Sequence, residues 1–432
     1  MPIALLTIFI IAYFIHVTAR IPVLGAMRMD MLLGGATLVA TFLLGTRDKL
    51  RLSVPTSRKL LLFLAYVVLS LPLVTWPGSV IRFNMVTWVK AAFFFLLVVG
   101  AVRTEGQLKW IMTVFLGSQT FRVLEPLYLH VKEGYWGDIA YSHVEGAMVG
   151  LNRLSGAPHD IVNANQYAWV IVSTLPFLFF LCWRGGKAGK LFFMASMPAF
   201  LYALWLTGSR SGALSLCVVA IAIAMTGPHR IRRTIYLCVL CLPVILYLFP
   251  KADIGLQNRY LSLVDVNVVG GDTRQGRLNA LARQLGSISQ NPLFGNGLGT
   301  SKETNVNVLG EAKTTHNLYI EVIQETGIFG FLLFAMYMIT LFKGVLLAER
   351  SLREKGYRDE DWLCRLILAT RVWIIMDIVY SLSCFGVSSW EWYFFGAVAT
   401  VCAALVAERR DAGAPAVGDK TEEVKVPAWG TS

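Results

Sequence analysis

The chain has 432 residues, of which 56% are hydrophobic and only 15% are charged. Soluble domains carry about 25% charged residues, so this composition excludes an ordinary soluble protein and predicts an integral membrane protein. The net charge of +12 is dispersed over short segments and forms no single basic stripe, which argues against a nucleic-acid partner.

Apolar runs recur along the chain with the length that a helix needs to cross the hydrocarbon layer, about 17–25 residues. Strand-like alternation is absent, which argues against an outer-membrane barrel. We therefore predict an all-α, polytopic membrane protein with about 12 transmembrane helices. The expected spans lie near residues 2–17, 29–45, 60–76, 86–102, 108–125, 163–183, 190–207, 212–227, 234–250, 318–347, 364–384 and 388–407.

The distribution of Lys and Arg predicts the orientation of these spans. Basic residues gather in loops 46–59, 184–190 and 228–233, in segment 343–365 and in the C-terminal tail. These segments alternate along the chain and fall on one side, so twelve spans place both termini in the cytoplasm. The first span shows no small-residue cleavage site before Arg20, so we interpret it as a span and not as a removed signal peptide.

Two segments on the opposite, outer side are long. They cover residues 126–162 and 251–317 and retain aromatic and apolar residues, so we expect them to be ordered. We assign residues 1–407 to one transmembrane helical domain that includes both loops. Residues 408–432 are rich in Ala, Gly, Pro and charge, and we expect a disordered cytoplasmic tail.

Cations inside or beside spans need an explanation. Arg82 lies in a short outer loop, and Lys90 lies inside the fourth expected span. A charge within a span is costly and is treated as functional by default. Arg122 and Arg371 are weaker candidates for a functional charge of this kind.

The entry to the sixth span, RLSGAPHDIVNANQYA over residues 153–168, is polar and rich in turn-forming residues. Arg153 and Asn165 are its candidate functional residues. The alternative is an ordinary loop with capping asparagines.

Residues 207–212, TGSRSG, form an expected tight outer turn that places Arg210 near the headgroups. Two interpretations stay open for this arginine. One is interfacial snorkelling. The other is an anion clamp, because the planar fork of a guanidinium matches phosphate oxygens.

The long loop 251–317 contains GDTRQGRLNALARQLGSISQNP, in which apolar residues recur at helical spacing. We expect an amphipathic helix on the outer membrane surface that ends at Asn291-Pro292. Arg277 flanks its apolar stripe and is a second candidate anion ligand. We interpret Arg283 as part of a solvated face.

Residues 312–331 read AKTTHNLYIEVIQETGIFGF. We expect a helix from Leu318 onward, capped by Thr314 or Thr315, with His316 at its outer end. An imidazole there can exchange protons near neutral pH. Glu321 and Glu325 are spaced i, i+4 and share a helix face. The alternative is a capped helix entrance with solvated acids.

No metal or other cofactor is expected. A histidine and a glutamate five residues apart, such as His316 and Glu321, do not face each other on a helix, and no second His or Cys is close in sequence. The seven cysteines lie in or beside apolar spans and indicate small buried side chains.

Four of these stretches, in order, resemble motifs of the O-antigen ligase and Wzy-type polymerase superfamily. They are RLSGAPHDIVNANQYA, LTGSRSG, DTRQGRLNALARQLGSISQNPLFGNGLG and THNLYIEVIQETGIFG, and the resemblance covers roughly residues 150–340. It implies a GT-C-like fold and a metal-independent, inverting glycosyltransferase. The implied donor is an undecaprenyl diphosphate-linked glycan, and the implied acceptor is the sugar of lipid A-core or another lipid-linked glycan.

Carried over to this chain, the resemblance implies that Arg210 and Arg277 bind the diphosphate and that His316 orients or deprotonates the acceptor hydroxyl. We add Arg82 and Lys90 to the expected diphosphate site. The supporting residues would be Asn317, which fixes the helix entry, and Arg153, Asn165, Glu321 and Glu325. The chain departs from the family pattern by offering two asparagines in 163–168 and by lacking a tryptophan soon after Arg277.

Three alternatives remain beside the ligase. A polymerase of polysaccharide repeat units needs the same donor site. A protein O-oligosaccharyltransferase shares the His-Asn stretch. A small-anion transporter usually has two similar halves with broken helices near the midplane; the sequence shows no repeat, and its polar motifs gather on one face, which favours an enzyme.

Overall fold

The computed structural model describes residues 1–44, 51–144, 147–160, 162–226, 254–261, 283–310, 315–357, 360–384 and 386–411. This part of the chain is helical except for one antiparallel hairpin, β1 (Gly137–Val144) and β2 (Ala147–Leu154). The prediction of an all-α membrane protein is therefore confirmed for the helical body. The hairpin lies inside the expected outer loop 126–162, where the sequence predicted order but no strand.

Each expected span except the ninth coincides with a described helix. Residues 234–250, the ninth span, and residues 412–432, most of the expected tail, lie outside the described part. Short helices at the loops are α2 (Val17–Arg20), α3 (Pro22–Ala26), α6 (Pro77–Ser79), α13 (Ile254–Leu261) and α15 (Ser301–Leu309). The helices at the expected spans are α1 (Pro2–Phe14), α4 (Met29–Leu44), α5 (Pro55–Leu69), α7 (Met85–Ala101), α8 (Glu105–Glu133), α9 (Ala164–Phe177), α10 (Lys187–Leu206), α11 (Arg210–Ala224), α16 (Leu318–Glu354), α17 (Trp362–Tyr380) and α18 (Glu391–Asp411).

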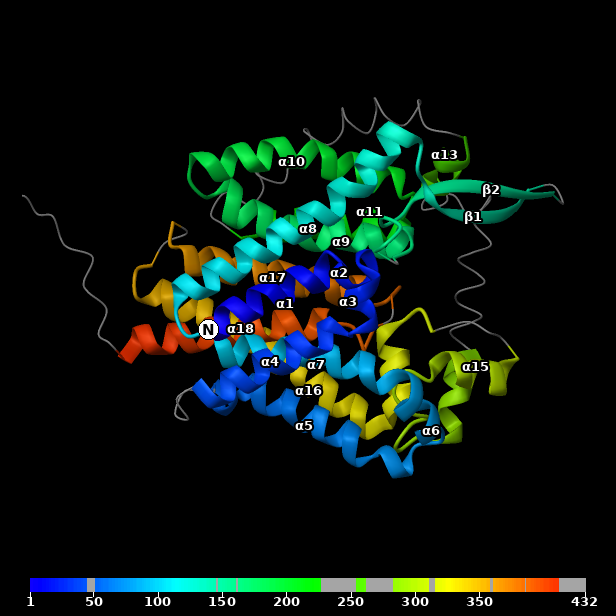
Figure 1. Cartoon of the computed structure of the whole chain (residues 1–432), viewed down its shortest axis with the longest axis horizontal. Helices are drawn as coiled ribbons and strands as arrows, with labels where there is room; N and C mark the ends of the chain where they lie inside the picture. The colour runs from blue at the N-terminus through cyan, green and yellow to red at the C-terminus, as the bar shows by residue number, and fades with distance from the viewer. Residues whose placement is uncertain are drawn as a thin grey trace, which may run out of the picture.

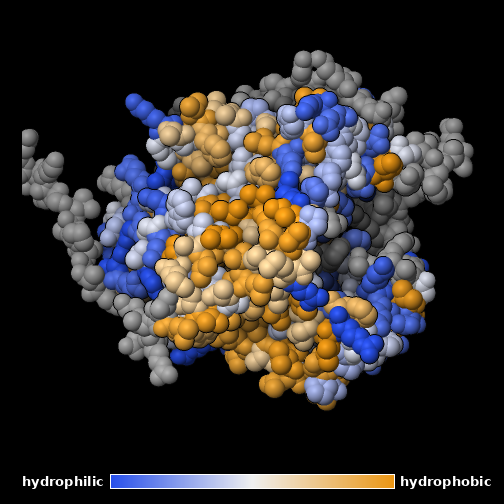
Figure 2. All heavy atoms as spheres, in the orientation of Figure 1, coloured by the Kyte–Doolittle hydropathy of each residue, from blue (hydrophilic) through white to orange (hydrophobic). Residues whose placement is uncertain are grey.

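Five helices in the described part are long and apolar enough to cross a membrane. They cover Pro77–Ala101, Ala164–Trp183, Lys187–Leu206, Leu318–Glu354 and Glu391–Arg409. Figure 2 shows hydrophobic side chains over the middle of the visible face and hydrophilic ones towards both ends. This pattern fits a membrane protein, while the number of about 12 spans stays a prediction.

Ion pairs gather several of the basic loops at one end of the helical body. Arg51 Nη2 lies 3.0 Å from Glu408 Oε1, and Arg409 pairs with both Glu105 and Asp361. Figure 1 shows the N-terminus at this end, with β1, β2, α6 and α15 at the other. The contacts agree with the predicted grouping of the basic segments on one side; which compartment each end faces stays a prediction.

Aromatic side chains pack α8, α9, α17 and α18 together. Phe115 stacks on Phe394 at 4.9 Å between ring centroids, and Phe177 stacks on Phe395 at 5.0 Å. The Trp373 ring lies 4.0 Å from the Phe395 ring. These side chains are buried, so their apolar contact fixes how the four helices lie beside each other.

Helix α16 is broken near its outer end, at Gly327, where φ is +65° and ψ is −173°. Loop 291–297 fills the break: the backbone N–H groups of Asn296 and Gly297 donate to the carbonyls of Gln324 and Glu325 at 2.9 Å each. Helical residues 283–290 end at Gln290, immediately before this loop, which confirms the predicted stop at Asn291-Pro292. The break therefore attaches the Gly-rich stretch to the start of α16.

Substitution of Gly327 by alanine should destabilise the protein strongly. A Cβ there would lie 2.3 Å from the Leu293 carbonyl oxygen, and its backbone conformation is one that essentially only glycine adopts. We expect a loss above the roughly 1–3 kcal/mol of the conformational strain alone, measured by thermal unfolding of the purified protein in detergent. Gly344→Ala, in the regular part of the same helix, is the matched control and should leave stability unchanged or slightly higher; equal effects of the two would contradict the role assigned to Gly327.

Candidate active site

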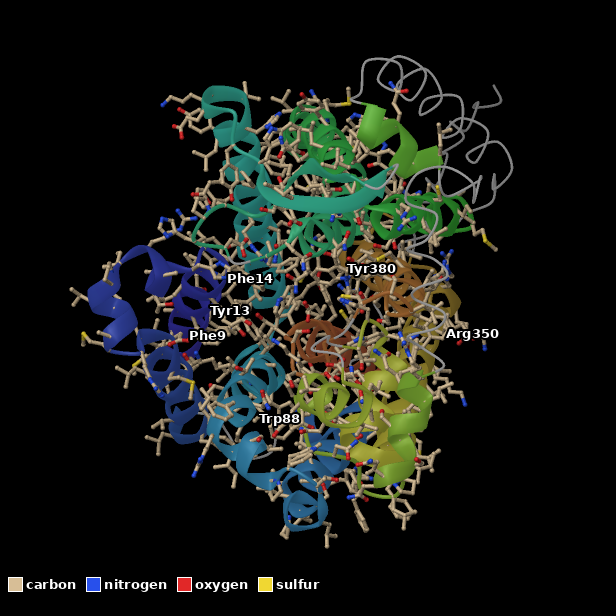
Figure 3. The ribbon with its side chains drawn as sticks, turned by 90° about the vertical axis from the view of Figure 1, so that its right-hand side faces the viewer. Phe9, Tyr13, Phe14, Trp88, Arg350 and Tyr380 are labelled. Carbon is tan, nitrogen blue, oxygen red and sulfur yellow. The ribbon has the colours of Figure 1, made fainter. Side chains whose placement is uncertain are left out.

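Two motifs predicted from the sequence meet at the C-terminal end of α17, and Arg153 joins a third motif to them. The Tyr380 hydroxyl donates to the Asn165 carbonyl at 2.7 Å, which joins α17 to the start of α9. The carbonyl of the next residue, Ser381, accepts from the Leu318 N–H at 2.9 Å. Figure 3 shows Tyr380 close to the middle of the molecule when this end faces the viewer. The end of α17 thus connects the 153–168 motif to the His-Asn motif, a connection that the sequence did not reveal.

Arg153 lies at the end of β2 and joins two motifs by hydrogen bonds. Its Nε donates to the Thr207 carbonyl and its Nη2 to Asn165 Oδ1, both at 2.7 Å. Burial lowers the pKa of the Arg153 guanidinium, while Asp138, with its carboxylate 3.8 Å away, acts in the opposite direction. Arg153 therefore holds the 207–212 turn against the start of α9, as a buried charge with several partners can.

Arg210 is the first residue of α11 and is half-buried. Ser209 caps this helix, since its Oγ accepts from the Gly212 N–H at 3.2 Å. The charge of Arg210 lowers the pKa of Arg153 further, so the two guanidinium groups share one electrostatic environment. Two arginines beside a helix N-terminus make this side of the site favourable for an anion.

His316 is exposed and immediately precedes the Asn317 cap of α16. Asn317 Oδ1 accepts from the N–H groups of Tyr319 at 3.0 Å and Ile320 at 3.2 Å. The prediction that Asn317 fixes the helix entry is confirmed. The alternative cap Thr315 is wrong, because its buried hydroxyl donates to Gln324 Oε1 at 2.8 Å instead; Thr314 lies outside the described residues.

Glu321 and Glu325 are buried, with 5% and 1% of their surface exposed, so the interpretation of solvated acids is wrong. Each carboxylate accepts two backbone N–H groups. Glu321 binds those of Gly386 at 2.7 Å and Val387 at 3.2 Å. Glu325 binds those of Gly299 at 2.7 Å and Ser301 at 3.2 Å. The helix face that they share therefore holds two different loops in place.

The other predicted cations are placed less centrally. Lys90 pairs with Asp30 on α4, so its charge in the span is compensated within the membrane domain. Arg82 is exposed in the turn Val80–Asn84 that links α6 to α7. Arg277 lies outside the described residues. Arg371, a weaker candidate, pairs with Glu349.

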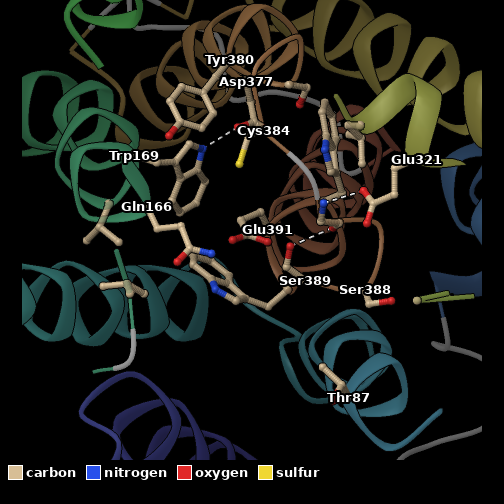
Figure 4. A pocket seen from close by; sticks show the side chains of 18 of the residues that line it. Thr87, Gln166, Trp169, Glu321, Asp377, Tyr380, Cys384, Ser388, Ser389 and Glu391 are labelled. Atoms are coloured by element: carbon tan, nitrogen blue, oxygen red, sulfur yellow. Dashed lines mark hydrogen bonds between the residues drawn. The ribbon is translucent and has the colours of Figure 1, made fainter. Parts of the chain in front are cut away.

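A cavity of about 340 Å³ lies beside the meeting point of the motifs. Leu318 and Tyr380 belong to its wall, so it begins where α16 starts and α17 ends. Figure 4 shows the carboxylate of Glu391 reaching into it from the start of α18, opposite Gln166. Further lining residues that no sequence motif indicated are Trp169, Asp377, Cys384, Ser388, Ser389, Trp390 and Trp392. They come from spans far apart in the sequence, which explains why they were missed.

Two contacts fix the polar part of the cavity wall. Trp169 Nε1 donates to Asp377 Oδ1 at 2.7 Å. Arg122 also lines the cavity, and its guanidinium holds both oxygens of Asp160, at 2.6 and 2.9 Å. The sequence marked Arg122 as a costly charge in a span, and Asp160 supplies the buried partner that explains it.

Replacement of Arg153 by lysine should weaken the site although it keeps the charge. A single ammonium does not reproduce the geometry by which Nε and Nη2 reach Thr207 and Asn165 together. We expect a loss of about 1.5–3 kcal/mol in stability, measured by unfolding in detergent. Arg58→Lys, at an exposed position in the basic loop 46–59, is the matched control; a loss no larger than that of the control would contradict the bridging role.

Residues 168–335 match a protein-family model described as O-antigen ligase. The matched stretch contains Arg210, Arg277 and the His316-Asn317 motif, but Arg153 and the end of α17 lie outside it. A comparison with curated proteins gave no match.

Proposed function

We propose that the chain is an inner-membrane glycosyltransferase of the O-antigen ligase superfamily that acts on the periplasmic face, because residues 168–335 match the O-antigen ligase family model. It transfers a glycan from undecaprenyl diphosphate to a sugar hydroxyl of the acceptor, as in O-antigen ligation to lipid A-core. The observation that supports this most directly is the meeting of the Arg153, Arg210 and His316 motifs around the end of α17.

In this proposal the diphosphate lies on the arginine side. Arg210 binds it with its guanidinium fork, at the N-terminus of α11. Arg277 adds a second fork from the segment outside the described residues, and the exposed Arg82 adds positive charge. Lys90 contributes less than the sequence suggested, because Asp30 already neutralises it. Arginines that neutralise the departing diphosphate make a metal ion unnecessary for this step.

His316 acts on the acceptor. Its imidazole takes the proton of the acceptor hydroxyl while the hydroxyl oxygen bonds to the anomeric carbon of the donor sugar. The bond from that carbon to the diphosphate oxygen breaks on the opposite face, so the configuration inverts. Asn317 supports this role by holding the first turn of α16 to the carbonyl of Leu382 at 3.2 Å. Glu321 and Glu325 then maintain the loops around the site and do not attack.

Alanine at His316 or Arg210 should abolish most transfer by the purified protein from a lipid diphosphate donor. Loss of a general base costs about 10²–10⁴-fold in rate, and loss of an anion-stabilising group is of similar size. The exposed His159→Ala and Arg58→Ala are matched controls and should retain activity. The assay contains EDTA throughout; wild-type rates in His316→Ala, or a requirement for Mg²⁺, would refute the assigned mechanism.

Deletion of the gene should distinguish ligation from polymerisation. A ligase transfers finished glycan, so its loss leaves lipid-linked polymer while lipid A-core stays uncapped. A polymerase joins repeat units, so its loss leaves only single units. We expect the first result, read from the size distribution of lipopolysaccharide on gels, and single units alone would assign the polymerase function instead.

The transporter alternative receives little support from the broken helix α16. Its free backbone groups near Gly327 are occupied by loop 291–297 and by the Tyr66 hydroxyl, which donates to the Thr326 carbonyl at 2.7 Å. A coordinating site in a transporter leaves such groups open to the ion.

A further inference from the structure

The cavity beside the His316 motif has walls that suit a sugar. Its volume of about 340 Å³ falls at the lower end of the range of about 300–1,000 Å³ for small-molecule sites. The rings of Trp169 and Trp390 lie 5.7 Å apart at an angle of 78°, which gives the cavity two apolar faces at nearly a right angle. Indole faces of this kind cover the C–H face of a sugar ring and leave its hydroxyls to polar groups.

The polar groups in the wall have capacity left for a ligand. The buried Ser388 Oγ has no hydrogen-bond partner within the described part of the chain. Glu321 uses Oε2 for both of its backbone contacts, and Asp377 uses Oδ1 for Trp169. A buried hydroxyl without a partner is costly, and sugar hydroxyls can both donate and accept. The wall therefore fits a ligand with several hydroxyls.

The wall is rich in acidic side chains and poor in basic ones. Glu321, Glu325, Asp377 and Glu391 line the cavity. Among the described lining residues Arg122 is the one Lys or Arg, and its Nε and Nη2 already donate to the two carboxylate oxygens of Asp160.

We propose that this cavity is a subsite for an uncharged sugar and that it disfavours phosphorylated and acidic sugars, because its acidic wall, in the part of the chain that the structure describes, offers an anion no available cation. The inference rests on the proposed function, in which an anionic diphosphate lies at Arg210 and needs a different environment from the sugar. Like charges brought together at a desolvated site are strongly disfavoured. Trp169 and Trp390 position the ring, Glu391 and Asp377 form hydrogen bonds with its hydroxyls, and the acidic wall disfavours an anionic substituent.

Cys384 lines the cavity, so the rate at which charged reagents modify its thiol measures the electrostatic potential of the cavity in the native protein. We would modify the protein with a cationic trimethylammonioethyl or an anionic sulfonatoethyl methanethiosulfonate and quantify each cysteine by mass spectrometry. A cysteine introduced at the exposed Ser289, just before loop 291–297, serves as the reference. We compare the rate of modification by the cationic reagent with that by the anionic reagent. This ratio of rates at Cys384 should exceed the ratio at the reference cysteine by about tenfold or more. Equal ratios would overturn the proposal.

Glu391→Gln should reduce this ratio, while Glu408→Gln, at the opposite end of α18, should not. Glu408 is the matched control because it pairs with Arg51 at the far end of the same helix. If both variants leave the ratio unchanged, the assigned carboxylate does not set the charge of the cavity, and the specificity mechanism is wrong.

Protection of Cys384 by sugars tests the ligand class without requiring turnover. Methyl β-D-glucopyranoside should slow modification more than glucuronate or glucose 6-phosphate at equal concentration, and equal protection by the anionic sugars, or none by any, would overturn the proposal. Competition of the glucoside against acceptor or against donor then shows which substrate supplies the ring. Transfer activity without sugar protection would refute the sugar subsite alone, whereas protection without transfer would refute only the proposed function.

Discussion

The hydrogen bonds at the outer end of α17 are the contacts on which the rest of the site depends. A helix that ends near a membrane surface leaves backbone carbonyls that need partners. Here the following turn receives the Leu318 N–H and the Asn317 side chain, and Tyr380 reaches the start of α9. Two helix beginnings are thereby fixed to one helix end. The positions of the Arg210 turn and of His316 follow, since Arg153 and the Asn317 cap attach them to this frame.

Charge is distributed unevenly over this frame. The guanidinium groups of Arg153 and Arg210 lie on the α11 side, whereas most ionisable groups in the cavity towards α16 and α18 are carboxyl groups. Asp160 neutralises the charge of Arg122, and Asp30 neutralises that of Lys90, so these two cations contribute little to the electrostatic field of the site. A substrate with an anionic part and an uncharged part therefore meets two different environments within one site, and this arrangement can orient it before any contact is made with His316.

The sequence predicted local features well, because they depend on neighbours in the chain. The helices at the expected spans and the helix stop before Asn291-Pro292 follow from composition and turn chemistry. It failed where partners are distant: the carboxylates of Glu321 and Glu325 are buried against loops 386–387 and 299–301, which no spacing rule identifies. The cavity has the same origin, since Trp169, Asp377 and Glu391 each come from a different helix. The roles of His316, Arg210 and Arg277 in catalysis stay predictions.

The break at Gly327 also has a consequence for how the chain assembles. The start of α16 takes its final form only when loop 291–297 pairs with it, and that loop in turn contacts residues 73–76, which are synthesised much earlier: Trp76 N–H donates to the Asn296 carbonyl and Asn291 Nδ2 donates to the Leu73 carbonyl. Residues 73–76 therefore obtain these hydrogen bonds only after a loop more than two hundred residues downstream has been synthesised. The last partner, the turn after α17, arrives later still. The site is consequently among the last regions of the molecule to become ordered during biosynthesis, and a chain that ends before α17 contains His316 and Arg210 without the frame that joins them.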